Sequence, residues 1–278
     1  MKNFVKALFA AALILINCAA SHAMLGENES ETRYRYMNAT GFADYPPFGT
    51  FYRGDFSSLF DDFIKDFCTA KDFEITYMSS QDNYNQDVQD VRTGNIDFII
   101  GMYSATDEYR GIEFIYPAAT INPIHIATLP ERTEEIQTID DLKGLKGLIS
   151  AQEHLSDYIN DKIGELQIEK NSSSYDMFEK LAKGEVDYII GSRYFLMIES
   201  AKLGIKDKIS FSKKAVWNIP VFFGVSKAYR HRGLVMEFMG KELKKPEVQQ
   251  KINNYLIQMI HNIERENAGV VPPTFINK

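Results

Sequence analysis

The sequence has few cysteines, a single tryptophan and, beyond its first residues, no long apolar run. Its 2 cysteines are Cys18 and Cys68. Cys18 belongs to a predicted N-terminal leader at 1–23, and removal of this leader leaves Cys68 as the one remaining cysteine. A lone cysteine excludes an intramolecular disulfide and a cysteine-rich metal site. Cys68 lies among helix-spaced apolar residues, which predicts a buried thiol that acts as a small hydrophobe. No stretch after the leader reaches the about 20 apolar residues of a membrane-spanning helix.

Basic clusters are also missing. The chain has 31 Lys and Arg against 38 Asp and Glu, which gives a formal net charge of −7. An acidic chain without a basic run repels a phosphate backbone, so we expect no nucleic-acid partner. The histidines show no metal-ligand spacing, and the sequence lacks phosphate-loop, nucleophile-elbow and zinc-helix motifs. We therefore expect no metal and no cofactor.

Residues 1–23 are predicted to be a secretory signal peptide that is not part of the fold. A basic start is followed by ten apolar residues at 7–16, too few to span a membrane, and by small residues that end at Ala23. We expect cleavage after Ala23 and export to a bacterial periplasm. Lipidation at Cys18, which follows a lipoprotein-like Leu-Ile-Asn, is the alternative.

An eight-residue pattern occurs twice, at 94–101 (Gly-Asn-Ile-Asp-Phe-Ile-Ile-Gly) and at 184–191 (Gly-Glu-Val-Asp-Tyr-Ile-Ile-Gly). Each copy follows a helix-like stretch, so each is predicted to end a helix–Gly–strand unit. The spacing is too long for a solenoid and indicates one α/β unit in each of two lobes. Matched strand ends favour a ligand cleft between the lobes. Asp97 and Asp187, inside the copies, are predicted to fix the local backbone.

Hydrophobic patterns predict the remaining elements. Residues 41–49, with two prolines and two glycines, are predicted to form a rigid aromatic loop without regular structure. The runs at 121–129 and 215–225 are candidates for two crossings between the lobes. Strands are also expected at 33–40, 74–78, 112–116 and 147–150, and helices at 55–68, 155–163, 194–202 and 234–263.

Six short motifs follow one another along the chain: Tyr-Pro-Pro-Phe at 45–48, Thr-Gly-Asn-Ile-Asp at 93–97, Ser-Ala-Thr-Asp-Glu at 104–108, Phe-Ile-Tyr-Pro at 114–117, Asp-Leu-Lys-Gly at 141–144 and Lys-Gly-Glu-Val-Asp at 183–187. Their order resembles that of family 3 bacterial extracellular solute-binding proteins, which include the periplasmic amino-acid receptors of ABC importers. The resemblance covers essentially the whole chain after the leader. It implies an α/β, two-lobed, periplasmic binding protein-like fold of type II, with two crossings and lobes that close on a ligand. The implied boundaries are 24–122 with 217–278 for lobe one and 123–216 for lobe two.

Three features of the amino-acid-binding members are altered in this sequence. The arginine expected three residues after Thr106 is replaced by Tyr109, and Arg110 comes one residue later. The glycine-threonine turn of lobe two reads Gln-Glu-His at 152–154. The aspartate that pairs with an α-ammonium group is replaced by Ser192. The resemblance therefore implies a solute binder more strongly than an α-amino-acid binder.

The candidate site combines loop aromatics, hydroxyl groups after the first repeated strand, and polar residues of lobe two. Arg110 either reaches the ligand through a local deletion or lies on the surface. Arg193 either clamps an anion or is a solvated residue at a helix start, where it opposes the helix dipole. The expected ligand-binding residues are Tyr45, Phe48, Tyr103, Ser104, Thr106, Arg110, Gln152, Ser192 and Arg193.

The resemblance implies a monomeric, non-enzymatic receptor. We expect it to bind a small polar solute, either an amino acid or a related small anion or zwitterion, and to deliver it to an inner-membrane ABC permease. One alternative is a periplasmic enzyme that resembles cyclohexadienyl dehydratases, with Glu108, Glu153 or His154 as acid and base. The other is a ligand-sensing partner of a membrane receptor, which the sequence does not distinguish from the first reading.

Overall fold

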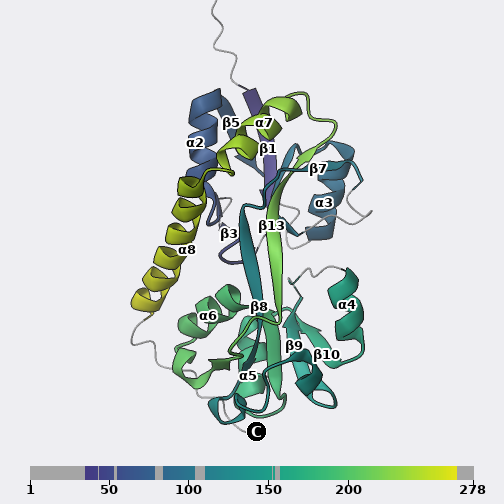
Figure 1. The fold of residues 1–278 in the computed structure, drawn as a ribbon, viewed down its shortest axis with the longest axis vertical. Helices are drawn as coiled ribbons and strands as arrows, with labels where there is room; N and C mark the ends of the chain where they lie inside the picture. The colour runs from purple at the N-terminus through teal and green to yellow at the C-terminus, as the bar shows by residue number, and fades with distance from the viewer. Residues whose placement is uncertain are drawn as a thin grey trace, which may run out of the picture. The chain divides into compact units, whose positions relative to one another are not determined.

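The computed structural model describes residues 35–42, 44–52, 55–78, 84–103, 110–151, 153 and 157–267 (Figure 1). The chain divides into two units, Met1–Arg35 and Tyr36–Lys278, and the elements below belong to the second apart from Arg35. The predicted signal peptide lies outside the described residues. In the part of the chain that the structure describes, no helix has the length and apolar character needed to cross a membrane.

A mixed sheet of ten strands forms the centre of this unit. Eight strands follow the order β10-β9-β11-β8-β13-β6-β1-β5, while β12 pairs with β8 and β7 pairs with β13. The strands are β1 (Arg35–Gly41), β5 (Phe73–Tyr77), β6 (Phe98–Tyr103), β7 (Ile112–Phe114), β8 (Thr120–Thr128), β9 (Lys146–Ser150), β10 (Gln167–Asn171), β11 (Tyr188–Ser192), β12 (Ser210–Phe211) and β13 (Trp217–Ser226).

Strands β8 and β13 belong to both halves of the sheet (Figure 1). Their first halves pair with each other, antiparallel, with Pro123 opposite Asn218 and Pro220 opposite Ile121. The second half of β8 pairs with β11, and the second half of β13 pairs with β6. The first lobe is thus built around β1, β5 and β6, and the second around β9, β10 and β11. The predicted crossings coincide with β8 and β13, whereas the lobe boundaries at 122/123 and 216/217 stay a prediction.

The two copies of the repeat occupy equivalent places in the lobes. Strand β6 pairs in parallel with β1, and β11 pairs in parallel with β9. Asp97 Oδ2 accepts a hydrogen bond of 2.9 Å from Asn38 N, and Asp187 Oδ2 accepts one of 2.8 Å from Lys146 N. Each aspartate therefore fixes the backbone where its neighbouring strand passes, as predicted.

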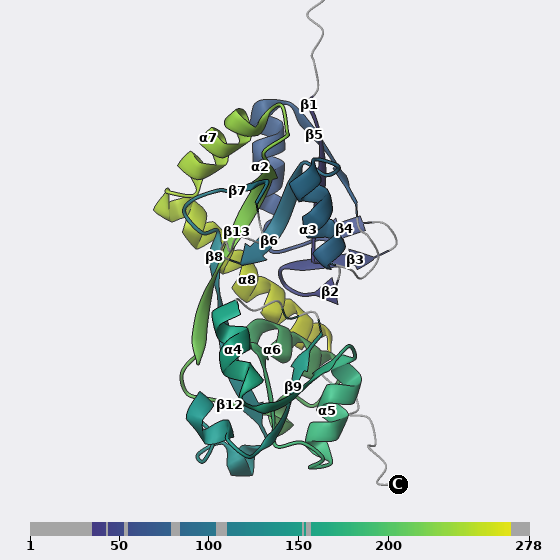
Figure 2. The same cartoon turned by 90° about the vertical axis from the view of Figure 1, so that its right-hand side faces the viewer.

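Helices cover both faces of the sheet (Figure 2).

Helix α5 begins where Ser173 Oγ accepts a hydrogen bond of 3.2 Å from Asp176 N and so caps the helix. Cys68 is half-buried against the core, and this burial raises the pKa of its thiol to about 11. The helices are α2 (Asp61–Lys71), α3 (Tyr84–Thr93), α4 (Asp157–Gly164), α5 (Ser174–Ala182), α6 (Arg193–Lys202), α7 (Arg232–Glu242) and α8 (Pro246–Glu266), with 3₁₀ turns at Pro130–Arg132, Ile139–Leu142 and Lys206–Lys208.

The predicted loop at 41–49 contains regular structure, so that prediction was wrong. A second, three-stranded sheet joins β2 (Asp44–Tyr45), β3 (Gly49–Tyr52) and β4 (Asp55–Ser57). Pro46 and Pro47 occupy the turn between β2 and β3, where a missing N–H breaks no ladder hydrogen bond. The pairing of β4 also removes the first residues of the helix predicted at 55–68, and α2 begins at Asp61.

The single helix predicted at 234–263 is two helices. Helix α7 ends at Glu242 and α8 begins at Pro246, whose ring lacks an N–H and suits the first position of a helix. Leu256 and Ile260 of α8 are buried against Ile198 of α6 in a small separate core. Helix α8 of the first lobe therefore packs on the second lobe as well.

Candidate functional site

The Glu153 carboxylate lies buried between the two lobes, with only 2% of the residue exposed. Its Oε2 accepts hydrogen bonds from the Tyr45 hydroxyl and, at 3.2 Å, from Ser192 N. Its Oε1 accepts a bond of 3.3 Å from the Tyr103 hydroxyl. That hydroxyl in turn accepts a bond of 2.8 Å from Asn122 Nδ2. We call these five buried residues the interlobe network.

Each lobe contributes to the network from the end of a strand. Tyr45 ends β2 and Tyr103 ends β6, whereas Ser192 ends β11. Asn122 belongs to the crossing strand β8, and Glu153 follows β9. The matched strand ends that the repeat predicted thus converge on one carboxylate.

Tyr45 and Glu153 occupy equivalent positions in the two lobes. Tyr45 comes seven residues after Asn38, and Glu153 comes seven residues after Lys146. Asn38 and Lys146 are the residues whose N–H groups bind the two repeat aspartates. The segments that follow β1 and β9, one from each lobe, therefore contact each other, and the hydrogen bond between Tyr45 and Glu153 joins them.

The N-terminus of α6 stabilises the carboxylate. Ser192 caps α6, with its Oγ accepting a bond of 3.4 Å from Phe195 N, while its own N–H points to Glu153. The positive end of a helix dipole favours a negative group at this place. Gly191 precedes Ser192 and packs close to this carboxylate, since a Cβ there would lie 3.5 Å from Glu153 Oε2, an ordinary van der Waals contact.

Aromatic rings surround the network. Tyr45 stacks on Phe195 of the second lobe, with ring centroids 4.9 Å apart and planes 12° apart. Phe42 contacts Tyr45 and Tyr103 at centroid distances of 5.4 and 5.8 Å. Ring stacking across the lobes adds contact area to the hydrogen bonds and excludes water from the carboxylate.

This exclusion of water changes the proton affinity of the site. Burial raises the pKa of Glu153 to about 7, although the hydrogen bonds from Tyr45, Ser192 and Tyr103 act in the opposite direction. Burial also raises the pKa of Tyr45 and of Tyr103, and the Glu153 charge adds to both shifts. Both phenols therefore stay protonated and donate. Within the described residues, the groups that lower the pKa of Glu153 are neutral donors and none is a cation.

The structure brings together four of the residues predicted from the sequence. Tyr45, Tyr103 and Ser192 belong to the interlobe network. Phe48 is fully buried beside it, with its ring 6.2 Å from that of Tyr45 and 6.4 Å from that of Tyr194. These contacts fit two roles of the Phe48 ring: it can line the candidate site, or it can anchor the segment at 41–49 to the core.

Neither of the two predicted arginines has a described hydrogen bond or ion pair with the network. The guanidinium group of Arg193 lies over the Phe211 ring, 5.5 Å from its centroid. Arg110 is exposed, and its carbonyl accepts a bond of 3.0 Å from Arg92 Nε. The predicted contacts of Ser104, Thr106 and Gln152 lie outside the described residues, as do Glu108 and His154 of the enzyme alternative.

The sequence predictions did not include Asn122, and they named Glu153 only as an acid of the enzyme alternative. Glu153 lies seven residues after Lys146, as Tyr45 lies seven residues after Asn38, but Asn38 and Lys146 are recognised as equivalent only through their hydrogen bonds to the repeat aspartates. No sequence signal marks Asn122, because its role depends on the pairing of β8 with β13.

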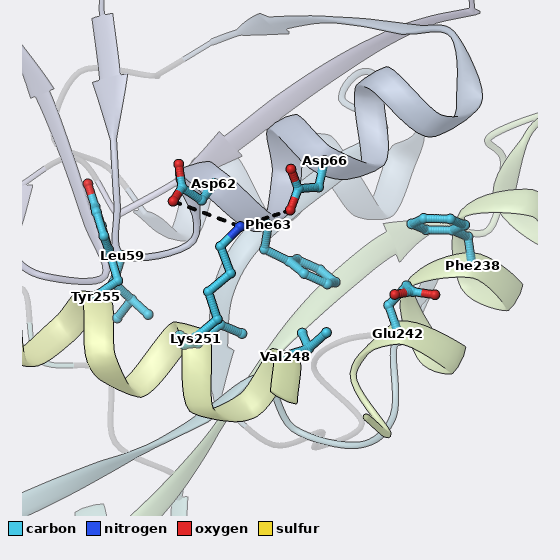
Figure 3. Close-up of a pocket in the computed structure, with 10 residues that line it drawn as sticks. Leu59, Asp62, Phe63, Asp66, Phe238, Glu242, Val248, Lys251 and Tyr255 are labelled. Carbon is cyan, nitrogen blue, oxygen red and sulfur yellow. Dashed lines mark hydrogen bonds and ion pairs between the residues drawn. The ribbon is translucent and has the colours of Figure 1, made fainter. Parts of the chain in front are cut away.

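Two further features are remote from the network. A pocket of the first lobe lies between α2, α7 and α8 (Figure 3), where Lys251 bridges Asp66 at 3.0 Å and Asp62 at 4.0 Å. Its cavity volume is about 60 Å³. The described residues contain no group of three side chains that could ligate a metal.

Comparisons with known proteins identify the fold. No family model and no curated protein matches the sequence. Among solved structures, the GluR0 ligand-binding core in complex with L-glutamate has a TM-score of 0.67 at 16% identity, covering 81% of this chain and 99% of that chain. A mutant of the arginine-binding protein ArgBP from T. maritima has a TM-score of 0.63 at 18% identity, covering 82% and 95%.

A third similar structure is an ancestral amino-acid-binding protein, described as a precursor of cyclohexadienyl dehydratase. It has a TM-score of 0.56 at 14% identity and covers 83% of this chain and 94% of that chain. Identities this low show the fold alone. They confirm the predicted fold class, and the chain has the two-lobed α/β fold of the substrate-binding proteins of amino-acid ABC transporters.

Proposed function

We propose that this protein is a periplasmic receptor that captures a small polar solute between its two lobes and delivers it to an inner-membrane ABC importer. The observation that carries the proposal is the interlobe network. Equivalent loops of the two lobes meet at one buried carboxylate, so a solute held there would contact both lobes at once.

The similar solved structures support a solute-binding role. Several are proteins whose descriptions name amino-acid ABC transport or a bound amino acid, such as an ABC transporter substrate-binding protein from Streptococcus pneumoniae bound to L-arginine. Export follows from the predicted signal peptide at 1–23. The step from shared fold to shared role is the proposal, because one fold serves many functions.

The geometry supports a mechanism of lobe closure. A ligand first binds the polar strand ends of one lobe, and rotation about β8 and β13 then adds contacts from the other lobe. The Tyr103 hydroxyl and the Ser192 N–H are donors that approach from opposite lobes. The permease would recognise the closed form, in which both surfaces are correctly placed.

Thermal unfolding of the purified protein with a panel of amino acids, amines and small carboxylates tests the proposal. A true ligand stabilises the native state in proportion to the logarithm of its concentration. We expect at least one compound to raise the melting temperature and to give a saturable heat of binding. If no compound in the panel does either, the proposed function is wrong.

A second candidate function is catalysis, and one observation favours it. A carboxyl group with a pKa of about 7, held beside two phenols, suits a general acid or base at neutral pH. One similar structure is described as a precursor of cyclohexadienyl dehydratase. Turnover of prephenate or arogenate by the purified protein, lost in Glu153→Gln, would establish this function. Absence of turnover in the unsubstituted protein would exclude it for these substrates.

A further inference from the structure

The surroundings of the Glu153 carboxylate depend on the contact between the lobes. Glu153 follows β9 of the second lobe, whereas Tyr45 and Tyr103, which donate to its two oxygens, belong to the first lobe. The described donor from its own lobe is Ser192 N, at 3.2 Å. Tyr45 also shields the carboxylate, because its ring stacks on Phe195 of the second lobe. Rotation of the lobes apart therefore removes two of these three donors and exposes the carboxylate to water.

An ionised carboxylate is poorly accommodated when the lobes are together. Glu153 is 2% exposed, and its described donors are neutral, namely two phenols and one backbone N–H. Burial of a charge without an opposite charge costs far more than burial of the neutral acid. The neutral acid fits, because its O–H can donate to a phenol oxygen and tyrosine hydroxyls accept as well as donate. Burial accordingly raises the pKa of Glu153 from 4.5 to about 7.

We propose that Glu153 takes up a proton when the lobes close, so that mild acid favours the closed form and a pH above neutral favours the open form. The inference concerns regulation of the site in the proposed function and rests on the lobe closure proposed there, but it needs no ligand. In the open form the carboxyl group is hydrated and behaves as an ordinary glutamate. The arrangement of the lobes then responds to the pH of the medium as well as to a solute.

The direction and the range of the response follow from the proton affinities of the two forms. With an ordinary pKa of 4.5 in the open form and a pKa of about 7 in the closed form, Glu153 is protonated in both forms below about pH 4.5 and ionised in both above about pH 7. Between these limits the ratio of closed to open protein falls by up to about 10-fold per pH unit. The additional stability of the closed form is thus complete in acid and is lost as the pH rises through about 7.

Several other titratable groups lie on the elements around the network. They are Tyr45 of β2, Tyr84 and Asp87 of α3, Tyr103 of β6, His125 of β8, and Arg193 and Tyr194 of α6. Burial raises the pKa of Tyr45, Tyr103 and Tyr194, so these phenols stay protonated in this range. Burial lowers the pKa of His125, whose ring lies 3.0 Å from the Ser212 carbonyl beside β12, on the part of β8 that pairs within the second lobe. A variant of Glu153 separates its effect from all of these.

Small-angle X-ray scattering of the purified protein without ligand, between pH 4.5 and 8 at constant salt, tests the inference. We expect the radius of gyration to increase as the pH rises through this range. Glu153→Gln is neutral at every pH and should remove the response. Glu169→Gln removes one exposed carboxylate from β10 of the same lobe and should keep it.

Carbon-13 NMR of the glutamate carboxyl groups gives a second measurement, which holds even if Glu153→Gln does not fold. We expect one carboxyl group of the unsubstituted protein to titrate near pH 7, over the pH range in which the radius changes. A constant radius in the unsubstituted protein, a response that survives in Glu153→Gln, or the lack of a carboxyl group that titrates near pH 7 would each show that the inference is wrong. The compound panel tests the proposed function separately, so a pH response without any ligand supports the inference while the proposed function fails.

Discussion

At the residue scale, Glu153 makes folding and closure depend on pH. Its pKa in the folded protein is about 7, above the ordinary value of 4.5. The folded state therefore holds this proton more tightly than the unfolded chain does. The resulting stabilisation is complete below about pH 4.5 and is lost as the pH rises through about 7.

The first prediction concerns this pH range. Glu153→Gln is neutral at every pH, so its free energy of unfolding relative to the unsubstituted protein should rise between about pH 4.5 and 7, by a few kcal/mol at most, since one pKa unit is about 1.4 kcal/mol. Urea unfolding of both proteins at pH 5, 6, 7 and 8 measures the difference. Two parallel pH profiles would show that Glu153 has an ordinary pKa.

A second prediction concerns the repeat aspartates. Asp97→Ala should lower the free energy of unfolding by about 1–3 kcal/mol, because the Asn38 N–H loses a charged acceptor. Asp97→Asn keeps an acceptor oxygen and should lose less. Chemical denaturation of the three proteins provides the test, and equal stability of the Ala and Asn variants would contradict the assigned role.

How far the sequence predicts a residue's role depends on how local that role is. The repeat aspartates were correctly interpreted, because each bonds to a neighbouring strand within its own lobe. Tyr45, Tyr103 and Ser192 were predicted to bind ligand because strand ends are general places for binding residues; the structure brings the three together at Glu153, and their ligand contacts stay a prediction. The bond between Tyr45 and Glu153 joins residues 108 positions apart. No periodicity within either segment encodes that contact, so only the comparison of the two halves could have indicated it.

At the element scale, local pattern located long elements better than short ones. The crossing strand predicted at 121–129 is β8, Thr120–Thr128. Strand β10 was missed because Gln-Ile-Glu-Lys-Asn, at the edge of the sheet, has no buried residue to create an alternating pattern. The break before Pro246 was missed because apolar spacing continues from α7 into α8, although a proline is itself a sequence signal for the first position of a helix.

The third prediction tests how α8 contributes to the second lobe. Leu256 is 4% exposed against α6, so Leu256→Ala should lower the free energy of unfolding by about 2–4 kcal/mol through lost packing. Ile257, the next residue, is 52% exposed, and Ile257→Ala should change stability by less than about 0.5 kcal/mol. Urea titration compares the two variants, and equal effects would show that α8 does not pack on α6 in solution.

At the scale of the whole molecule, the closed arrangement has its own support without a ligand. Tyr45 bonds to Glu153 and stacks on Phe195, and α8 reaches α6. In the proposed mechanism of lobe closure, the Tyr45 contacts form when the lobes come together and contribute to the balance between open and closed forms. A ligand must bind the closed form better than these contacts do.

The fourth prediction concerns that balance. Tyr45→Ala removes both the hydrogen bond and the ring stack, and should shift the unliganded protein toward the open form. Tyr45→Phe keeps the stack on Phe195 and should shift it less. Small-angle X-ray scattering measures the radius of gyration, which we expect to increase in the order unsubstituted, Tyr45→Phe, Tyr45→Ala. An unchanged radius in Tyr45→Ala would show that this contact does not hold the lobes together.

The two strands shared by the lobes carry one proline each within their paired halves. The pairing nevertheless runs without a break from Trp217 and Ile124 to Val221 and Thr120, so both prolines occupy places where a missing N–H takes no bond from the ladder. Their rings fix the backbone angle φ at one point of each strand in the ribbon between the lobes. Replacing Pro220 by valine would free that angle without adding a ladder bond.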